Sequence, residues 1–158
     1  MRSWRSVGKA CSGCSATAHL STTCRPGRRP WSDARTCSVP AAHLAEFMHP
    51  GATLLFTDGV HGGTAYRVGE RPGELDARHW HSIPIQKYVD PVGAGDTFLA
   101  AVFAAWVDPA ITSGWDGPDP DLRLGAACGS LILEGPGVFG VPYLEDAILR
   151  MHGGDNPD

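Results

Sequence analysis

The sequence has no long apolar run and no excess of positive charge. No stretch of about 18 or more apolar residues is present, which is what a membrane-spanning helix needs. The formal net charge is −4 at pH 7, whereas nucleic-acid-binding domains are typically basic. We therefore expect neither a membrane nor a nucleic acid as a partner.

What remains is a globular composition over 158 residues, enough for one domain with its own core. Apolar residues make up 42% and charged residues 19%, a balance that favours neither a disordered nor a membrane class. The charges are unevenly distributed, because residues 1–40 hold seven of the 13 basic residues and only one of the 17 acids. Residues 1–40 are therefore basic and the rest of the chain is acidic, which does not fit one evenly composed domain.

The first forty residues show no helical or strand periodicity. Cys11 and Cys14 have the spacing of zinc ligands, but Cys24 and Cys37 do not form a second such pair. The Arg- and Ser-rich, acid-poor composition also fits a transit peptide. We favour a third interpretation, in which residues 1–40 are a disordered or artefactual leader. Since no secretory apolar segment is present, we expect a cytoplasmic protein.

From residue 41 the pattern alternates between short strands and helices. Residues 41–48 fit a short helix, and Thr53 to Thr57 fit a strand covered on both faces, because its apolar residues are consecutive. Residues 64–68 fit the partner strand of a hairpin. We expect residues 69–79 to form a surface loop and residues 81–85 a further short strand.

Three helices are predicted in the second half of the chain. Residues 97–106 are apolar and Ala-rich, which predicts a helix buried nearly all round. A second apolar helix covers residues 121–133. A third begins with Pro142 at its first position and runs to about Met151, leaving residues 153–158 as a frayed tail. Alternating elements predict an α/β architecture, with too few strands for a complete doubly covered sheet.

A glycine-rich loop, residues 90–96 (DPVGAGD), leads directly into the first of these helices. We call it the phosphate loop. The first turn of a helix has unpaired backbone N–H groups at the positive end of its dipole, and small residues let an anion approach them. The sequence therefore predicts an anion hole at Gly93, Ala94 and Gly95. Asp96, beside it, could accept the proton of an alcohol that attacks a phosphorus atom.

The same loop has three other possible interpretations. Asp96 could be only an N-terminal helix cap, with the glycines forming a turn. A Rossmann dinucleotide site does not fit, because Phe98 stands at the third glycine position and no apolar strand precedes the loop. A Walker A loop does not fit either, because Gly-Lys-Ser/Thr is missing.

The loop and its helix resemble the C-terminal signature of the ribokinase/pfkB-type carbohydrate kinases. Three further segments resemble that family in the expected order. They are Thr57 to Gly62 as a turn before a hairpin, residues 126–133 as a small-residue helix beside the adenine, and residues 135–142 as a closing loop. The likeness covers about residues 41–150. It implies a truncated ribokinase-like α/β fold, with residues 41–152 as the C-terminal part of the kinase domain.

The resemblance also implies an activity and the residues that serve it. The chain is expected to be an ATP-dependent phosphotransferase acting on an alcohol group of a sugar or sugar-like substrate, with Mg²⁺ bound to the ATP. Asp96 is implied as the catalytic base and residues 93–95 as the anion hole. Nucleotide contacts are implied for Thr57, Gly59, Gly62, Ala126, Gly129 and Gly137. A monovalent cation such as K⁺ is implied at Asp90 with the Val92 carbonyl.

The sequence departs from the family in two respects. Val92 replaces a common Thr or Ser, which weakens the cation assignment. Family members are about twice this length, and their N-terminal half carries the sugar site and the lid that usually forms a homodimer. The alternative function is therefore a catalytically incompetent nucleotide-binding fragment, and a homodimer is expected only of a full-length form.

Two other residue types, histidine and cysteine, invite a functional interpretation. His79 and His81 alternate as a metal pair on a strand would, but we favour solvated histidines. Cys128 lies among small residues and is expected to be a buried packing residue. His61 lies in the turn near the predicted phosphates and could contact a nucleotide, although an ordinary turn residue is favoured.

Overall fold

A computed structural model of the chain describes residues 19–21 and 41–153, which belong to two compact units. The first unit contains the described residues up to Asp58 together with residues 64–77, and the second contains residues 59–63 and 78–153. The predicted zinc site, transit peptide and leader lie outside the described residues, apart from residues 19–21. The same holds for residues 154–158 of the predicted tail, whereas Gly153 is helical.

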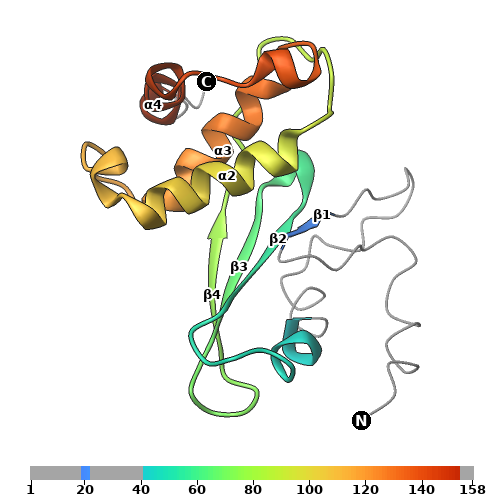
Figure 1. Cartoon of the computed structure of the whole chain (residues 1–158), viewed down its shortest axis with the longest axis vertical. Coiled ribbons are helices and arrows are strands. Elements are labelled where there is room, and N and C mark those ends of the chain that lie inside the picture. Colours follow the sequence, from blue (N-terminus) through green and yellow to red (C-terminus); the bar gives the residue numbers. More distant parts are fainter. Residues whose placement is uncertain (1–18, 22–40, 154–158) are drawn as a thin grey trace. The chain divides into compact units, whose positions relative to one another are not determined.

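A sheet of four strands forms in the order β1-β2-β3-β4 (Figure 1). The strands are β1 (His19–Ser21), β2 (Thr53–Thr57), β3 (Gly63–Val68) and β4 (Leu75–Trp80). β1 is parallel to β2, with His19 opposite Leu55. The Val68 N–H at the end of β3 donates to the carbonyl of Ala52, the residue just before β2, at 2.9 Å, as expected for a hairpin. The predictions of strands at residues 53–57 and 64–68 are confirmed.

The core of the first unit lies against β2. Leu54, Leu55 and Phe56 are all buried, which confirms that both faces of this strand are covered. Phe56 meets Tyr66 edge-on, with ring centroids 5.7 Å apart. The predicted helix at residues 41–48 is shorter than expected, since it covers residues 41–45 and continues as turns. Its apolar side contributes to the cluster of Ala41, Leu44, Met48, Leu54, Phe56, Tyr66 and Leu75.

The predicted loop at residues 69–79 is confirmed for residues 69–74 but was wrong beyond them, because β4 occupies residues 75–80. The predicted strand at residues 81–85 was wrong, because these residues form no strand. β4 lies at one end of the strand order, and Asp76, Ala77 and His79 are exposed on it. A strand at an edge tolerates such polar residues, so its sequence does not show the expected apolar alternation. Pro84 has no N–H group to donate to a ladder, which disfavours a strand after Trp80.

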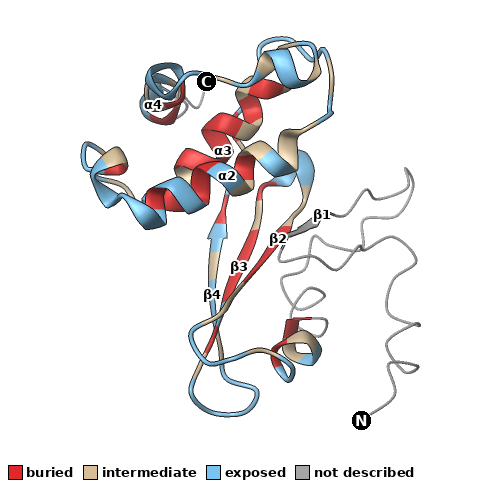
Figure 2. Cartoon of the chain, in the orientation of Figure 1, coloured by how far each residue is buried: buried red, intermediate tan, exposed pale blue. Residues whose placement is uncertain are grey.

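The second unit is built on the α2 (Ala94–Val107) and α3 (Pro120–Ile132) helices, which confirm the two predicted apolar helices. They pack against each other, and Figure 2 shows buried residues along their contact. The expectation that the first helix is buried nearly all round was wrong. Phe103 is 44% and Trp106 is 42% exposed, because only one side of α2, including Phe98 and Val102, is buried.

The close approach of α2 and α3 depends on a glycine. A Cβ atom at Gly125 would lie 2.8 Å from side-chain atoms of both Phe98 and Val102. Such a distance is shorter than ordinary van der Waals contact, so the two helices can come this close only without a side chain at this position.

Gly125→Ala is therefore expected to lower the free energy of unfolding by about 1–3 kcal/mol, because overpacking would displace Phe98 or Val102. Urea unfolding of the chain measures the change. Gly114→Ala is the matched control, since the nearest atom to its new Cβ would be His152 Nε2 at 3.9 Å. Equal effects of the two substitutions would contradict the packing argument.

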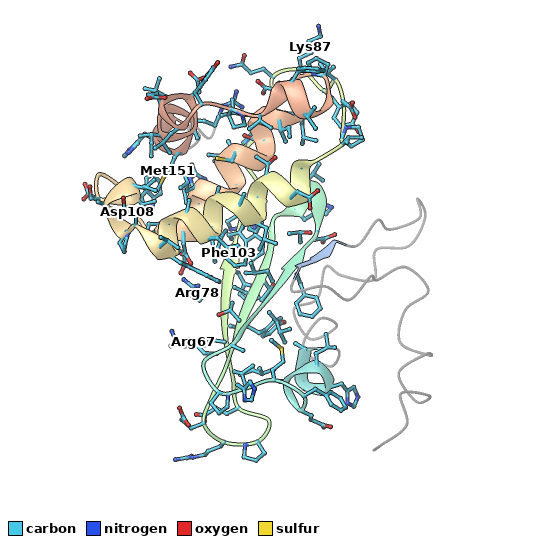
Figure 3. The ribbon with its side chains drawn as sticks, in the orientation of Figure 1. Arg67, Arg78, Lys87, Phe103, Asp108 and Met151 are labelled. Carbon is cyan, nitrogen blue, oxygen red and sulfur yellow. The ribbon has the colours of Figure 1, made fainter. Side chains whose placement is uncertain are left out.

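A charged cluster joins the end of β4 to both helices of the second unit. Arg78, labelled in Figure 3, donates to Asp121 at 3.2 and 3.1 Å and to Asp119 at 3.0 Å. Trp106 Nε1 donates to the same Asp121 carboxylate at 2.7 Å. Asp119, before α3, has a φ of 48°, and its backbone is held there although it is not glycine. Trp80, the last residue of β4, stacks on Phe98 of α2 with ring centroids 5.1 Å apart.

The last helix, α4 (Leu144–Gly153), begins two residues after Pro142 rather than at it. Ala147 and Met151 are its buried residues, and Arg123 Nε donates to the Met151 carbonyl at 3.2 Å. Short helical turns η2 (Gly59–His61), η3 (Pro109–Thr112) and η4 (Gly137–Gly140) connect the elements. Among the described residues no helix has both the length and the apolar character needed to cross a membrane.

Candidate functional site

The phosphate loop has a backbone shape that its sequence dictates. Asp90 Oδ1 accepts a hydrogen bond from the Val92 N–H at 2.9 Å, which closes a turn around Pro91. Gly93 has a φ of 86°, a conformation that favours glycine, and an added Cβ would lie 3.1 Å from Ile132 Cδ1. The backbone angle therefore favours glycine at the entry to α2, and the contact with α3 leaves little room for a side chain.

The first turn of α2 presents unpaired N–H groups. Gly93 is the N-cap residue and has no side chain with which to cap them. The Thr97 N–H reaches the Gly93 carbonyl at 2.8 Å, and the Ala94 N–H makes a long bond of 3.4 Å to the Pro91 carbonyl. The N–H groups of Gly93, Gly95 and Asp96 have no hydrogen-bond partner among the described residues. Such a turn can accept an anion.

Asp96 is the third residue of α2 and its side chain is exposed. Its carboxylate makes no hydrogen bond or ion pair with any other residue that the structure describes. The alternative interpretation of Asp96 as the N-cap was wrong, because Gly93 holds that position and no side-chain cap bond forms. A carboxylate within one helical turn of unpaired N–H groups is available to a ligand.

The loop after α3 approaches the start of the phosphate loop at Asp90. Gly137 has a φ of 52°, and a Cβ on it would lie 3.5 Å from Asp90 Oδ2. The structure thus brings together two predicted site residues, Asp90 and Gly137, that are far apart in the sequence. Val92, whose carbonyl is the other predicted ligand of a monovalent cation, is 59% exposed.

The small residues of α3 have packing partners in the structure. Beyond Gly125, a Cβ on Gly129 would lie 3.6 Å from both the Ala94 carbonyl oxygen and Phe98 Cβ. Ala126 is buried, and so is Cys128, as predicted. Burial raises the pKa of the Cys128 thiol to about 11, so the thiol stays protonated at neutral pH. The predicted nucleotide contacts of Ala126 and Gly129 stay predictions.

The predicted turn residues are divided between the two units. Thr57 ends β2 in the first unit, whereas Gly59 and Gly62 belong to the second. Gly62 is buried with a φ of 86°, and a Cβ there would lie 2.0 Å from the Trp80 carbonyl oxygen. Close backbone approach therefore explains this glycine. Ser82 Oγ also donates to the Val60 carbonyl in the same turn.

The histidines that sequence analysis considered are all exposed. His61 lies in η2, His79 on β4 and His81 just after it. No group of three or more His, Cys, Asp or Glu residues that could hold a metal occurs among residues 19–21 and 41–153.

A cleft of about 760 Å³ lies in the second unit between residues 83–86, the end of α3 and α4. None of the predicted site residues lines it. Its wall includes an ion pair that sequence analysis missed, in which Arg150 donates to both oxygens of Glu134 at 3.0 and 2.9 Å. The hydrogen bonds from Arg150 outweigh burial and hold the pKa of Glu134 below its usual value. No local spacing signals a pair that is 16 residues apart.

Comparison with protein families matches residues 33–142 to the model described as pfkB family carbohydrate kinase. The match begins within the segment that sequence analysis interpreted as a leader. A search of curated proteins found no match.

Solved structures show the same likeness. Ribokinase of Arabidopsis thaliana, complexed with ribose and ATP, has 23% identity and a TM-score of 0.61 over 76% of this chain and 35% of its own. A putative ribokinase II from E. coli, in complex with ATP and Mg²⁺, has 24% identity and a TM-score of 0.56 over 80% and 34%. A nucleoside kinase of Methanocaldococcus jannaschii, described as an archaeal member of the ribokinase family, has 26% identity and a TM-score of 0.50 over 63% and 30%. The chain spans about a third of the length of these structures, and the predicted ribokinase-like α/β fold, present in part, is confirmed.

Proposed function

The chain belongs to the pfkB family of carbohydrate kinases, and we propose that it transfers the γ-phosphoryl group of Mg-ATP to an alcohol group of a sugar or sugar-like substrate. The observation that carries this proposal is the first turn of α2. There the carboxylate of Asp96, which has no partner among the described residues, lies within one turn of the unpaired N–H groups of Gly93 and Gly95. A kinase needs both a base and an anion site next to each other.

The proposed reaction uses Asp96 as a general base. Its carboxylate accepts the hydroxyl proton of the acceptor while the alcohol oxygen forms a bond to the γ-phosphorus atom. The bond between that phosphorus and the β-phosphate oxygen breaks, and ADP leaves with the electron pair. The N–H groups of residues 93–95 offset the negative charge on the transferred phosphoryl oxygens.

The proposed cofactors fit the chain to different degrees. A triphosphate fits the unpaired N–H groups at the start of α2. Mg²⁺ would be carried on the ATP phosphates and would neutralise charge there, because this ion keeps several waters and needs few protein ligands. A monovalent cation such as K⁺ would use Asp90 Oδ2, which faces Gly137, together with the Val92 carbonyl.

The remaining proposals concern the nucleotide and the whole protein. Nucleotide contacts are proposed for Thr57, Gly59, Gly62, Ala126, Gly129 and Gly137. We also propose that residues 41–152 form the C-terminal part of a kinase domain that works in the cytoplasm. Residues 1–40 are proposed as a leader, residues 153–158 as a tail, and a homodimer as the state of a full-length form.

A second candidate function is that of a nucleotide-binding fragment without phosphotransferase activity. The observation in its favour is length, because the chain spans about a third of the solved structures that it resembles. Under this alternative the phosphate loop still binds ATP, but no acceptor is held beside Asp96.

Thermal melting with Mg-ATP, followed by a transfer assay with a panel of sugars and nucleosides, separates the two functions. A nucleotide at 100 times its Kd is expected to stabilise the chain by about 2.7 kcal/mol, seen as a higher Tm. Phosphorylated acceptor in the same samples supports the kinase, whereas a raised Tm without product supports the binding fragment. An unchanged Tm at millimolar Mg-ATP counts against both, and Mg-GTP serves as a matched comparison for base selectivity.

A further inference from the structure

The segment that leads into the phosphate loop is held by polar contacts to the end of α3. The N–H groups of Val89 and Asp90 both donate to the Leu133 carbonyl, at 2.8 and 3.3 Å. One residue further along the α3 end, Glu134 Oε1 accepts the N–H of Gln86 at 2.7 Å. Two consecutive residues, Leu133 and Glu134, thus set the path of residues 86–90. Leu133 acts through its backbone carbonyl and Glu134 through its side chain.

Glu134 is itself held in place by α4. Arg150 donates to both of its carboxylate oxygens, and the Glu134 and Arg150 side chains are only 19% and 15% exposed. A bidentate pair of this kind fixes the plane of the carboxylate as well as its position. Arg150 also donates to the Pro84 carbonyl at 3.2 Å, two residues before Gln86. Both ends of the ion pair therefore contact the segment that precedes the phosphate loop.

The contact is carried over a short length of chain. Asp90 lies four residues after Gln86, and its carboxylate makes the turn to Val92 that opens the phosphate loop. No helix or strand lies between these positions, so the path of this segment depends on the contacts that residues 86, 89 and 90 make with the end of α3. The α2 end of the loop has a separate attachment, the packing of Gly93 on Ile132.

We propose that Glu134 and Arg150 are positioning residues for the phosphate loop, acting through the backbone of residues 84–90 to set where Asp90 and the loop lie. The expected effect on nucleotide binding rests on the function proposed above. Its structural part, the order of residues 86–92, is independent of any activity.

A charge exchange separates positioning from simple stabilisation. Glu134→Arg with Arg150→Glu restores an ion pair between α3 and α4, but a guanidinium has no acceptor for the Gln86 N–H and a carboxylate cannot donate to the Pro84 carbonyl. The exchanged chain is expected to regain most of the Tm that Glu134→Ala loses. Its Gln86, Val89 and Asp90 amides are expected to exchange with solvent about 10- to 100-fold faster than in the unchanged chain.

Two measurements decide the outcome. Hydrogen exchange reports the amides of residues 86–90 and 92. Tm shifts with Mg-ATP report its Kd, which is expected to rise about 10-fold in both Glu134→Ala and the exchanged chain. Glu134→Gln keeps an oxygen for the Gln86 N–H and should restore part of the protection. If the exchanged chain recovers slow exchange together with its Tm, the pair is only structural and the proposal fails. If the unchanged chain binds no Mg-ATP, the proposed function fails while the exchange data still decide the positioning role.

Discussion

Asp96→Asn is expected to lower phosphoryl transfer from Mg-ATP by about 10²–10⁴-fold, the usual contribution of a general base. Asparagine has nearly the shape of aspartate but cannot take the acceptor's proton. Because Asp96 is exposed and has no partner among the described residues, the substitution should leave the Tm nearly unchanged. Product formation is measured with the sugar or nucleoside that gives the highest turnover.

Asp116→Asn is the matched control for this substitution. Asp116 is also exposed, and its replacement changes the net charge by the same amount. Turnover in Asp116→Asn should equal that of the unchanged chain. Unaltered turnover in Asp96→Asn, or an equal loss in both variants, would remove Asp96 from the role of base.

Arg78→Met is expected to lower the free energy of unfolding by about 3 kcal/mol, at the lower end of the range for breaking a buried ion pair because Arg78 is 36% exposed. The substitution leaves the Asp121 carboxylate, only 11% exposed, with Trp106 as its remaining side-chain donor in the described structure. Arg67→Met on the exposed side of β3 is the control (Figure 3) and should change the free energy by less than about 0.5 kcal/mol. Urea unfolding measures both.

A double substitution shows whether the buried charge causes this loss. Arg78→Met with Asp121→Asn removes both charges of the most buried pair and leaves only the more exposed Asp119 without its arginine, so it should be more stable than the sum of the two single effects predicts. Strict additivity of the two substitutions would show that the cluster contributes by packing alone.

The same cluster gives stability a defined dependence on acid. Burial alone would raise the pKa of Asp121, but hydrogen bonds from Arg78 and Trp106 outweigh it and lower the pKa. The stabilisation is therefore complete above the unfolded pKa, about 3.9, and is lost as the pH falls toward and through the folded pKa. The loss of stability as the pH falls below about 4 should be shallower in Asp121→Asn than in the unchanged chain.

The parts of the fold that sequence could predict are those with a strong local pattern. Consecutive apolar residues identified β2, and an Ala-rich run identified most of α2. The phosphate loop was found because small residues before a helix have a direct physical meaning. Gly93, Gly95 and Asp96 indeed lie in one turn, although their roles with a nucleotide stay predictions.

The parts that were missed depend on tertiary contacts. The polar residues Asp76, Arg78 and His79 are typical of a loop and conceal β4 in the sequence, yet Arg78 is neutralised by acids 41 and 43 residues away. The start of α2 was placed too late because glycines lower helix propensity, whereas at Gly93, the N-cap, a positive φ favours glycine. The Glu134–Arg150 pair has no sequence signature, because each residue alone looks like an ordinary surface charge.

The polar character of β4 has a consequence for how copies of the chain behave in a concentrated solution. In the described part of the sheet, β4 has a strand neighbour on one side only. An edge of this kind can template amyloid-like stacking when its side chains are apolar. Asp76, exposed on β4, would meet its own counterpart in a parallel, in-register stack of copies, and bringing such like charges together is unfavourable. The residues that concealed this strand in the sequence thus also protect the sheet from growing beyond it.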